Sequence, residues 1–374
     1  MKRGKGPAME SKSLIGKLVD FYVRPRHISA HIFRASISLL GVLALGGGFS
    51  LIYKDRNSNQ ELAFSWGDGP GEFAFWALFF VATVSTFFSL LMALRRSELE
   101  LKELQVSRVL AIELRGLVDT ADSPLIRAIP AKTAGRRESC LVDVRRLVMG
   151  PTPNIPEALN ELAQLRRHIR LIAAGTSREH LTIVAGGVMQ VSLLFYAGVL
   201  LDDEGRVQLM EWERAAGHWR ELDEQDNEER FSISGLDKVQ SLSPDVVVAV
   251  SASYLADLAG IAQTFPEMPV VHARLPDPKP NTLLSESMQK ELTRQFTSIM
   301  AELANRSVGI VHLILAAPAT LCIRLGQAYD PRNMPTLKCY QRERDQTPPY
   351  PWHISIEGDK PVQFEQTSKP VTQN

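Results

Sequence analysis

Two long uncharged stretches near the N-terminus dominate the hydrophobic pattern of the chain. One runs from Ala35 to Tyr53 and the other from Phe73 to Leu94, and charged residues flank both. As helices that rise ~1.5 Å per residue, they would be about 28 and 33 Å long, which matches a bilayer hydrocarbon core of about 30 Å. A cleaved signal peptide would explain one stretch but not two. We therefore predict a two-helix transmembrane hairpin over residues 35–94, with a buried hairpin in a soluble core as the alternative.

The charges around these stretches predict the orientation of the hairpin. Residues 1–53 hold eight Lys or Arg residues against two acidic ones, and Arg95 and Arg96 follow the second stretch directly. The connector, residues 54–72, holds two basic and four acidic residues. Because cytoplasmic flanks of membrane helices are rich in Lys and Arg, we expect both termini in the cytoplasm. The basic N-terminal segment would then lie beside anionic lipid headgroups.

The first stretch contains four glycines, at position 41 and at positions 46–48. Glycine lets a partner backbone approach closely in a membrane helix, and it costs about 1 kcal/mol of helix stability relative to alanine. Two interpretations follow. The glycines allow simple packing of the hairpin, or they make a deformable span that repacks when the protein oligomerises.

Beyond the hairpin, short runs rich in Val and Ile alternate with helical patterns. Such alternation predicts βα units around a mostly parallel sheet that is covered on both faces. The predicted strands are residues 109–114, 141–144, 181–185, 207–212, 246–250, 270–273, 310–315 and 337–341. The predicted helices are residues 156–173, 188–201, 254–263 and 285–305. Residues 95–108 predict a helical linker, and the acidic stretch 221–230 predicts a solvated connector between two halves.

An internal repeat supports the division into two halves. Leu181–Arg214 and Val311–Arg344 align without gaps at an offset of 130. Each has an apolar strand, small residues, an amphipathic helix, a turn, an alternating strand and a Glu-Arg pair, and a tryptophan follows in both. The alternative is convergence of two βαβ units on one pattern. We predict two transmembrane α-helices followed by an α/β domain of tandem Rossmann-like halves.

Composition and charge narrow the function. The chain has 374 residues, with 42 Lys or Arg against 42 Asp or Glu, so its net charge of zero argues against a general nucleic-acid coat protein. Residues 1–53 carry +6 and residues 54–72 carry −2, which leaves −4 for residues 73–374. An anionic ligand therefore needs a local site. Three cysteines without a CxxC spacing exclude a disulfide scaffold.

Three predicted strands end in small or hydroxyl-bearing residues just before a helix. Backbone N–H groups at a helix N-terminus favour an anion, and ligands of parallel sheets bind at the carboxyl ends of the strands. We therefore predict that these segments bind phosphate, with the tyrosine stacking on a base. The residues are Gly186, Gly187 and Gln190; Ser251, Ser253 and Tyr254; and Ala317, Pro318 and Thr320. Tight packing between strand and helix is the alternative for each segment.

No sequence pattern marks a catalytic centre. The motifs GxxxxGK[ST], HExxH, GxSxG and GxGxxG do not occur, and the eight histidines have no metal-ligand spacing. Cys140 and Cys322 adjoin apolar runs and are interpreted as small buried side chains. We therefore expect a protein that is not an enzyme and that needs no metal or cofactor.

The order of elements over residues 109–360 resembles the SAVED domain, a fusion of two CARF-like, Rossmann-like halves. The resemblance is carried by SCLVDVRRL at 139–147, the strand–Gly-Gly–helix at 181–201, VHLILAAPATLCIRLGQAY at 311–329, the strands 207–212 and 337–341, and Trp352. The two spans resemble the two-helix membrane module that is fused to SAVED in effectors of the cyclic-oligonucleotide antiphage system CBASS. The expected boundaries are a basic cytoplasmic segment 1–34, the hairpin 35–94, the linker 95–108, the SAVED domain 109–360 with halves at about 109–225 and 240–360, and a tail 361–374.

The resemblance implies a CBASS effector in the bacterial inner membrane. A partner nucleotide cyclase makes a cyclic di- or trinucleotide, and the SAVED domain binds it between its halves and forms a homo-oligomer. The membrane module then disrupts the bilayer, which leads to abortive infection. Carried over to this chain, the three strand-end segments line the pocket, with Arg145, Arg146 and Arg274 as the nearest candidate phosphate partners.

The resemblance implies no DNA partner. The identity of the nucleotide, the stoichiometry of the oligomer and the mode of membrane damage stay open. Two rival hypotheses remain: a membrane-tethered CARF-like nuclease that degrades cyclic oligonucleotides, and a non-toxic membrane-anchored sensing module.

Overall fold

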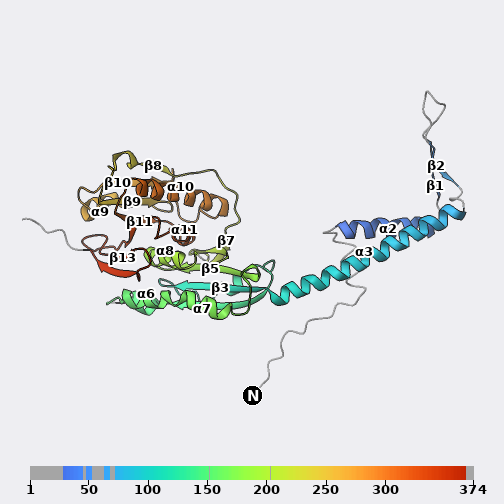
Figure 1. Cartoon of the computed structure of the whole chain (residues 1–374), viewed down its shortest axis with the longest axis horizontal. Helices are drawn as coiled ribbons and strands as arrows, with labels where there is room; N and C mark the ends of the chain where they lie inside the picture. The colour runs from blue at the N-terminus through green and yellow to red at the C-terminus, as the bar shows by residue number, and fades with distance from the viewer. Residues whose placement is uncertain are drawn as a thin grey trace, which may run out of the picture. The chain divides into compact units, whose positions relative to one another are not determined.

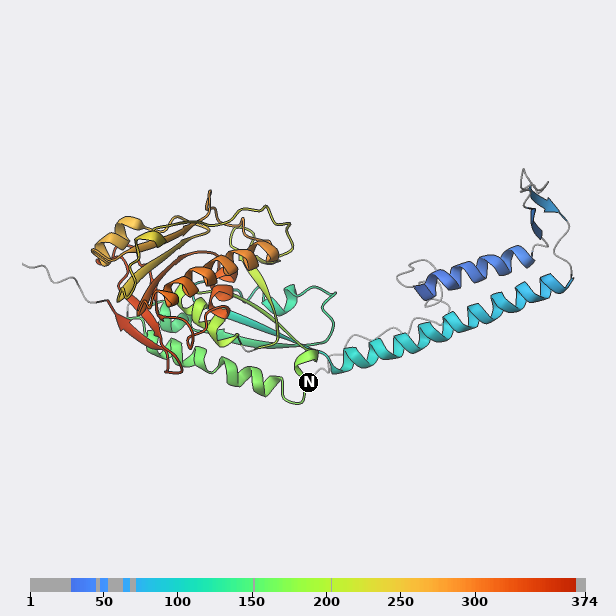
Figure 2. The ribbon, with the colours of Figure 1, turned by 45° about the horizontal axis from the view of Figure 1, so that its top comes forward.

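The computed structural model describes residues 28–44, 48–52, 63–67, 72–150, 152–202 and 204–367 of the chain. Two units make up the protein, residues 1–103 and residues 104–374 (Figures 1 and 2). The first holds the predicted membrane segments, and the second holds the α/β sheets.

Two helices and a short β-hairpin form the described part of the first unit. The elements are α2 (Ile28–Ala44), β1 (Gly48–Ile52), β2 (Ala63–Gly67) and α3 (Glu72–Val106). β1 pairs antiparallel with β2 in the connection between the helices, and α2 runs alongside α3 (Figure 1). α3 has 35 residues and is therefore about 52 Å long at ~1.5 Å per residue. This one helix contains both the second predicted span and most of the predicted helical linker.

The first predicted span ends earlier than we expected. The uncharged stretch 35–53 was predicted as one helix, but α2 ends at Ala44 and residues 48–52 form strand β1. The three successive glycines at positions 46–48 account for the difference, because each one weakens a helix by ~1 kcal/mol relative to alanine.

Among the described residues, one helical segment is long and apolar enough to cross a bilayer, Phe75–Arg95 in α3. The apolar part of α2, His31–Leu43, is shorter. Phe80 is 69% exposed on the surface of the long segment, as expected of a side chain that meets lipid. The hydroxyls of Thr83 and Thr86 donate to carbonyls four residues earlier, at 2.8 and 2.7 Å, so these polar groups are satisfied within the helix.

Two sheets with the same internal strand order form the second unit. The first is β4-β3-β5-β6-β7 and the second is β14-β13-β12-β11-β9-β10-β8. Five adjacent strands of the second sheet, β10-β9-β11-β12-β13, repeat the order of the first, with four parallel strands and one antiparallel strand at the end. The topology therefore confirms the predicted tandem Rossmann-like halves.

The elements of the first half are β3 (Arg108–Arg115), α4 (Leu125–Ala128), β4 (Arg136–Asp143), α5 (Arg145–Val148), α6 (Ile155–Ala163), α7 (Leu165–Ile172), β5 (Leu181–Val188), α8 (Val191–Leu200), β6 (Arg206–Glu213) and β7 (His218–Glu221). The elements of the second half are β8 (Ser232–Ser234), β9 (Asp245–Ser251), α9 (Leu258–Thr264), β10 (Val270–Arg274), α10 (Glu286–Asn305), β11 (Ile310–Ala316), α11 (Ala319–Gln327), β12 (Thr336–Gln341), β13 (Trp352–Ile356) and β14 (Gln363–Gln366). Short 3-10 turns at Arg178–His180 and Leu236–Lys238 precede β5 and β9.

The predicted elements differ from the observed ones mainly at their ends. The helix predicted over 156–173 is two helices, α6 and α7, which meet at Gln164. The helix predicted over 254–263 begins at Leu258, because the Asp257 side chain accepts the Gly260 N–H at 2.9 Å and caps the helix there. Strands β7, β8, β13 and β14 were not predicted, because they are short and have no continuous Val- and Ile-rich run.

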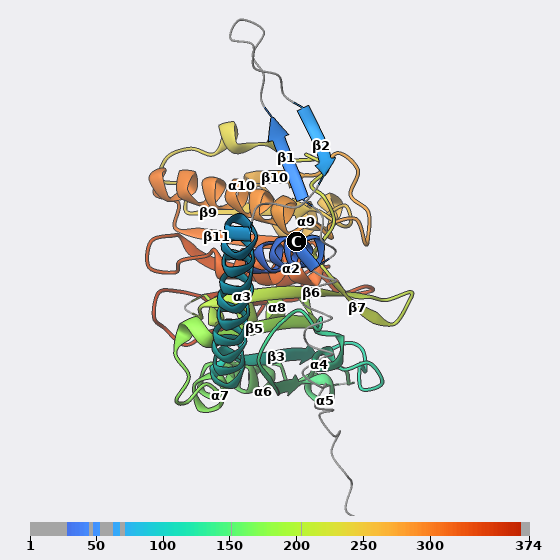
Figure 3. The same cartoon turned by 90° about the vertical axis from the view of Figure 1, so that its right-hand side faces the viewer.

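Helices α8 and α11 lie between the two sheets, and each contacts strands of the other half (Figures 1 and 3). One hydrophobic core therefore continues through both halves; it includes Leu194 and Phe195 from α8 and Leu321 and Leu325 from α11. Smaller clusters cover the outer faces of the two sheets.

The two central helices cross in direct backbone contact. A Cβ atom at Gly198 in α8 would lie 2.0 Å from the carbonyl oxygen of Ile323 in α11, and one at Gly326 would lie 2.0 Å from the carbonyl oxygen of Phe195. The contact is therefore reciprocal, as expected of two halves related by an approximate two-fold axis. Any side chain at either position would force the helices apart.

We predict that Gly198→Ala destabilises the protein by about 2 kcal/mol. Overpacking costs about 1–3 kcal/mol, and a backbone carbonyl cannot rotate away, while alanine returns ~1 kcal/mol of helix propensity. The melting temperature of the full-length protein in detergent, followed by circular dichroism, should fall by roughly 4–8 °C. Gly205→Ala is the matched control, because the nearest atom there lies 3.7 Å away. Equal melting temperatures for the two variants would contradict the prediction.

A network of polar side chains crosses the second sheet; His312, Tyr340 and His353 are buried, and Asp245 and Glu365 are partly exposed. His312 Nδ1 lies 2.9 Å from the Tyr340 hydroxyl, and its Nε2 lies 3.2 Å from an oxygen of Asp245. The rings of Tyr340 and His353 are 4.5 Å apart, and His353 Nε2 lies 3.1 Å from Glu365 Oε2. Burial lowers the pKa of His353 from 6.5 to about 4.

We expect acidification to destabilise the protein through His353. The unfolded chain takes up a proton on this histidine below pH 6.5, whereas the folded protein resists it down to about pH 4, so stability falls across that window. The full difference between the two pKa values corresponds to about 3 kcal/mol of folding free energy. The melting temperature should therefore fall less in His353→Gln than in the wild type between pH 7 and pH 5. His218 is exposed, so His218→Gln should show the same fall as the wild type. Identical pH dependence in all three proteins would refute this role.

Candidate functional site

A pocket of about 270 Å³ lies between the two halves, at the carboxyl ends of β5, β6, β9 and β11. We call it the inter-half pocket. It is lined by Gly187, Val188, Met189, Val191, Leu194, Glu211, Trp212, Arg214, Ala215, Ser253, Tyr254, Pro280, Asn281, Ala317, Pro318 and Ala319. Open parallel sheets bind their ligands at this end of the strands. The pocket faces the first turns of α8 and α11, one from each half.

Five of the residues predicted from the sequence line this pocket: Gly187, Ser253, Tyr254, Ala317 and Pro318. They come from three segments that are up to 131 positions apart, between residues 187 and 318. The Tyr254 ring is 59% exposed and so is available for stacking. The Ser253 and Tyr254 N–H groups both donate to the Ala316 carbonyl, at 2.9 and 3.4 Å, which fixes this loop beside β11.

Four other predicted residues lie next to the pocket but not in its lining. A Cβ at Gly186 would lie 2.6 Å from the Trp219 ring, so this glycine serves strand packing. The Ser251 hydroxyl is buried; it accepts the Ala256 N–H at 2.9 Å and lies 2.8 Å from His272 Nε2. Gln190 is 8% exposed. Thr320 is fully buried and is bonded to Glu211.

The three predicted arginines lie elsewhere. Arg145 and Arg146 line a separate surface pocket of about 740 Å³ at the carboxyl end of β4. Arg145 is held there by Asp143 and Asp119, at 2.6 and 2.7 Å, and its guanidinium keeps the pKa of both carboxyls below the usual value. Arg274 is exposed at the carboxyl end of β10. None of the three is therefore positioned in the inter-half pocket.

Four polar or aromatic lining residues were missed from the sequence: Glu211, Trp212, Arg214 and Asn281. Arg214 is exposed just beyond β6, and Trp212 packs edge-on against Trp219 with ring centroids 5.1 Å apart. The sequence does carry a signal for Arg214, because the Glu-Arg pair that closes the first repeat ends at this residue. The pair marks the duplication, and its arginine also lines the pocket.

Glu211 joins the two halves at the pocket wall. Its Oε2 accepts the Thr320 N–H at 2.9 Å and the Thr320 hydroxyl at 2.6 Å, so a carboxylate from β6 caps the first turn of α11. Burial raises the pKa of Glu211, and the hydrogen bonds from Thr320 act in the opposite direction. A negative group at a helix N-terminus is favourable because of the exposed N–H groups there.

The first turn of α8, the equivalent helix of the first half, is capped differently. The side chain of its N-cap residue Gln190 makes no cap hydrogen bond. Gln190 Oε1 and Ser192 Oγ are buried, and neither has a hydrogen-bond partner among the described residues. The two helix N-termini beside the pocket are therefore chemically different.

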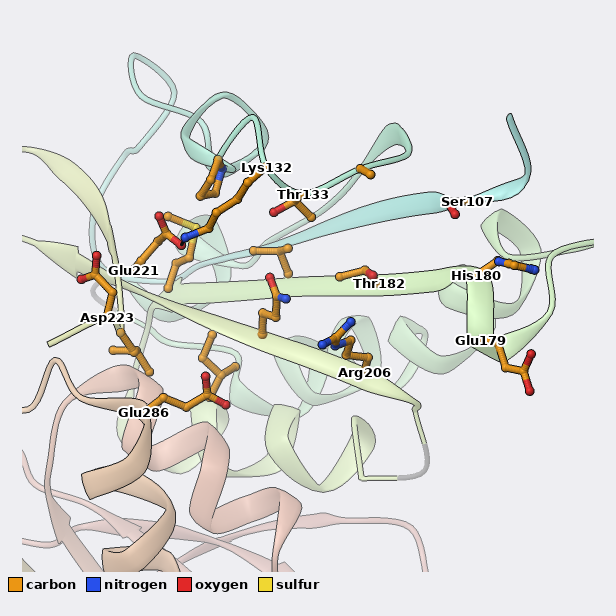
Figure 4. A pocket seen from close by; sticks show the side chains of 17 residues that line it. Ser107, Lys132, Thr133, Glu179, His180, Thr182, Arg206, Glu221, Asp223 and Glu286 are labelled. Carbon is orange, nitrogen blue, oxygen red and sulfur yellow. Dashed lines mark ion pairs between the residues drawn. The ribbon is translucent and has the colours of Figure 1, made fainter. Parts of the chain in front are cut away.

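A larger cavity of about 630 Å³ lies at the opposite end of the first sheet (Figure 4). Ser107, His180 and Thr182 place it at the amino ends of β3 and β5, where parallel sheets do not bind ligands. Its charged groups are Lys132 and Arg206 against four carboxylates, those of Glu179, Glu221, Asp223 and Glu286. Lys132 points toward Glu221, at 2.8 Å, so one of the two cations is already paired (Figure 4). This balance disfavours a phosphate ligand.

The nucleophile candidates within the described part of the chain are inaccessible. The Ser251–His272 pair has hydrogen-bond geometry, but the Ser251 hydroxyl has no exposed surface. Burial raises the pKa of the thiols of Cys140, Cys322 and Cys339, which disfavours the reactive thiolate. The described residues include no group of three or more His, Cys, Asp or Glu side chains that could hold a metal.

Two family models match the chain in tandem. Residues 164–356 match the sensor domain described as SMODS-associated and fused to various effectors, SAVED. Residues 11–159 match the SAVED-fused 2TM effector domain. No curated protein matches the chain.

Several solved structures are similar to this chain. The Cap4 SAVED/CARF-domain containing receptor of Acinetobacter baumannii with the cyclic trinucleotide 3'3'3'-cAAA has 12% identity and a TM-score of 0.45, over 75% of this chain and 59% of that one. The same receptor with 2'3'3'-cAAA has 11% identity, a TM-score of 0.45 and the same coverage. The Cap4 receptor of Moraxella osloensis has 10% identity and a TM-score of 0.42, over 75% and 57%. This chain thus spans less than two thirds of the length of these receptors.

Proposed function

We propose that this protein, which belongs to the SAVED family of sensor domains and carries a 2TM effector domain, is a membrane effector of a CBASS antiphage system. Its activating ligand would be a cyclic di- or trinucleotide from a partner nucleotide cyclase. The observation that carries this proposal is the inter-half pocket, where two Rossmann-like halves present the carboxyl ends of their strands to one another.

The chemistry of the pocket supports a nucleotide ligand. Tyr254 offers an exposed ring for a base, and Arg214 offers a guanidinium for a phosphate. Asn281 adds an amide that both donates and accepts hydrogen bonds. We infer that Arg214 takes the role that the sequence had led us to give to Arg145, Arg146 and Arg274.

We infer that the sensor domain begins near residue 109, as expected from the sequence, although the two family models divide the chain near residue 160. The same eight residues of β3 pair with β5 on one side and with β4 on the other. A domain without residues 108–143 would lack β3 and β4, two of the five strands of the first sheet. The segment 1–34 would then be the cytoplasmic N-terminal segment and residues 35–94 the two-pass inner-membrane hairpin. The expected domain end at residue 360 is too early, because β14 pairs with β13 in the sheet of the second half, so the tail is shorter than 361–374.

Activation would proceed by linkage between ligand binding and assembly. A ligand shifts the equilibrium toward the homo-oligomer only as far as it binds the assembled state more tightly than the monomer. Assembly raises the effective concentration of the membrane segments in the bilayer plane. The glycine-rich end of the first span would then allow repacking that disrupts the membrane.

The first test is a thermal-shift screen of full-length protein in detergent against a panel of cyclic di- and trinucleotides, 3'3'3'-cAAA among them. At least one should raise the melting temperature, and Arg214→Gln should weaken its binding at least tenfold, because a hydrogen bond to a charged group contributes about 1.5–3 kcal/mol. Arg220→Gln is the control, because Arg220 pairs with Glu224 at 2.9 Å and lies outside the pocket lining. No shift with any nucleotide would refute the ligand class.

The second test reconstitutes the protein in liposomes loaded with a self-quenched dye. The nucleotide found in the screen should release the dye, and Arg214→Gln should require at least tenfold more nucleotide, because binding is coupled to assembly. Binding without dye release would favour the non-toxic sensing module. Linear oligonucleotide among the products, detected by chromatography, would favour the nuclease.

A further inference from the structure

A carboxylate stands in the wall of the pocket that we expect to receive phosphates. The charged side chains in the lining are Glu211 and Arg214, three positions apart at the end of β6. The ligand therefore meets one negative group on β6 and one positive group just beyond the end of this strand. Glu211 reaches across to Thr320 in the second half.

Glu211 already fills the anion position at the first turn of α11. The N-cap residue of this nine-residue helix is Pro318, whose ring has no polar atom with which to cap it. The Glu211 carboxylate takes this role from the other half, with two hydrogen bonds from Thr320. Thr320 is fixed in turn by Gln289, whose Nε2 donates to the Thr320 hydroxyl at 2.8 Å. A phosphate reaches these N–H groups only by displacing Glu211.

The repeat shows that the charge is particular to one half. At the offset of 130 between the repeats, Gln341 in β12 corresponds to Glu211 in β6. Gln341 is neutral, and its Oε1 is buried without a partner among the described residues. The scaffold therefore tolerates a neutral amide at this position, and capping alone does not explain the charge at Glu211.

The Glu211 carboxylate keeps acceptor capacity for a ligand. Two carboxylate oxygens offer about four lone-pair sites. Thr320 uses two of them, and the backbone N–H of Ala319 also bonds to the group. Glu211 lines the pocket, where its carboxylate attracts a ligand group that donates a hydrogen bond and repels a phosphate.

We propose that Glu211 determines specificity by orienting the ligand: it accepts a hydrogen bond from a base amino group or ribose hydroxyl, and it directs the phosphates toward Arg214 and the first half. The inference rests on the proposed function, because it assigns an orientation to the same class of ligand. A site built around a hydrogen-bond acceptor rejects analogues that lack the matching donor.

The first experiment uses inorganic pyrophosphate as the probe and full-length protein in detergent. Calorimetric titration should show at least tenfold tighter pyrophosphate binding to Glu211→Ala than to the wild type, because the first turn of α11 is then open to an anion. Glu211→Gln keeps an acceptor for Thr320 and so preserves the cap; it should bind pyrophosphate severalfold more tightly than the wild type. Glu213→Gln, on the same strand but outside the lining, is the matched control. Wild-type affinity in a folded Glu211→Gln protein would overturn the proposal.

The second experiment measures selectivity between ligands that differ by one donor. The wild type should prefer 3'3'3'-cAAA over its inosine counterpart, which lacks the base amino groups, or over its 2'-deoxy counterpart, which lacks the hydroxyls. Glu211→Gln should reduce the preference about tenfold, because a neutral acceptor binds a donor more weakly than a charged one. An unchanged preference would refute the role of Glu211. If the wild type binds no cyclic nucleotide, the proposed function fails, while the pyrophosphate titration still decides the role of Glu211.

Discussion

The whole sensor unit depends on one close contact, the crossing of α8 and α11 at Gly198 and Gly326. Backbone meets backbone there, because a Cβ at either glycine would lie 2.0 Å from a carbonyl oxygen of the other helix. This closeness brings both helices between the sheets and lets one hydrophobic core extend through both halves. It also sets the distance across the inter-half pocket, since the first turns of the same two helices form its walls. The duplicated fold and the inter-half pocket are thus consequences of the same packing.

The pocket can act as a sensor because it is made by two halves and not by one. Val188 and Trp212 come from the first sheet, and Ser253 and Ala317 follow strands of the second. A ligand in contact with both sheets changes the free energy of their relative arrangement, whereas a ligand held by one sheet would not. The bond from Glu211 to Thr320 already crosses this boundary.

Much of the fold could be predicted from the sequence, because buried parallel strands are continuous apolar runs and the halves repeat the same order of elements. The end of the first span could not be predicted, since the glycines at 46–48 outweigh the apolar character of the stretch. Only part of the site could be predicted, and the reason is topological. Arg145 does follow a parallel strand, but that strand, β4, lies two strands from β5, or about 10 Å away at ~4.8 Å per strand. Strand order depends on contacts far apart in sequence, so the linear pattern could not separate Arg145 from Arg214.

The divergence of the two halves suits the kind of ligand that we propose. A pocket with exact two-fold symmetry would present the same groups from both sides. A ring of three nucleotides, one of the two ligand classes that we propose, has no two-fold axis that would place like groups against both walls. Replacing one of two equivalent residues resolves this mismatch, as Glu211 and Gln341 illustrate. In our proposal the Glu211 carboxylate selects hydrogen-bond donors and Arg214 selects phosphate. Duplication supplied a pocket between two sheets, and divergence of the residues around it would supply the orientation of the proposed ligand.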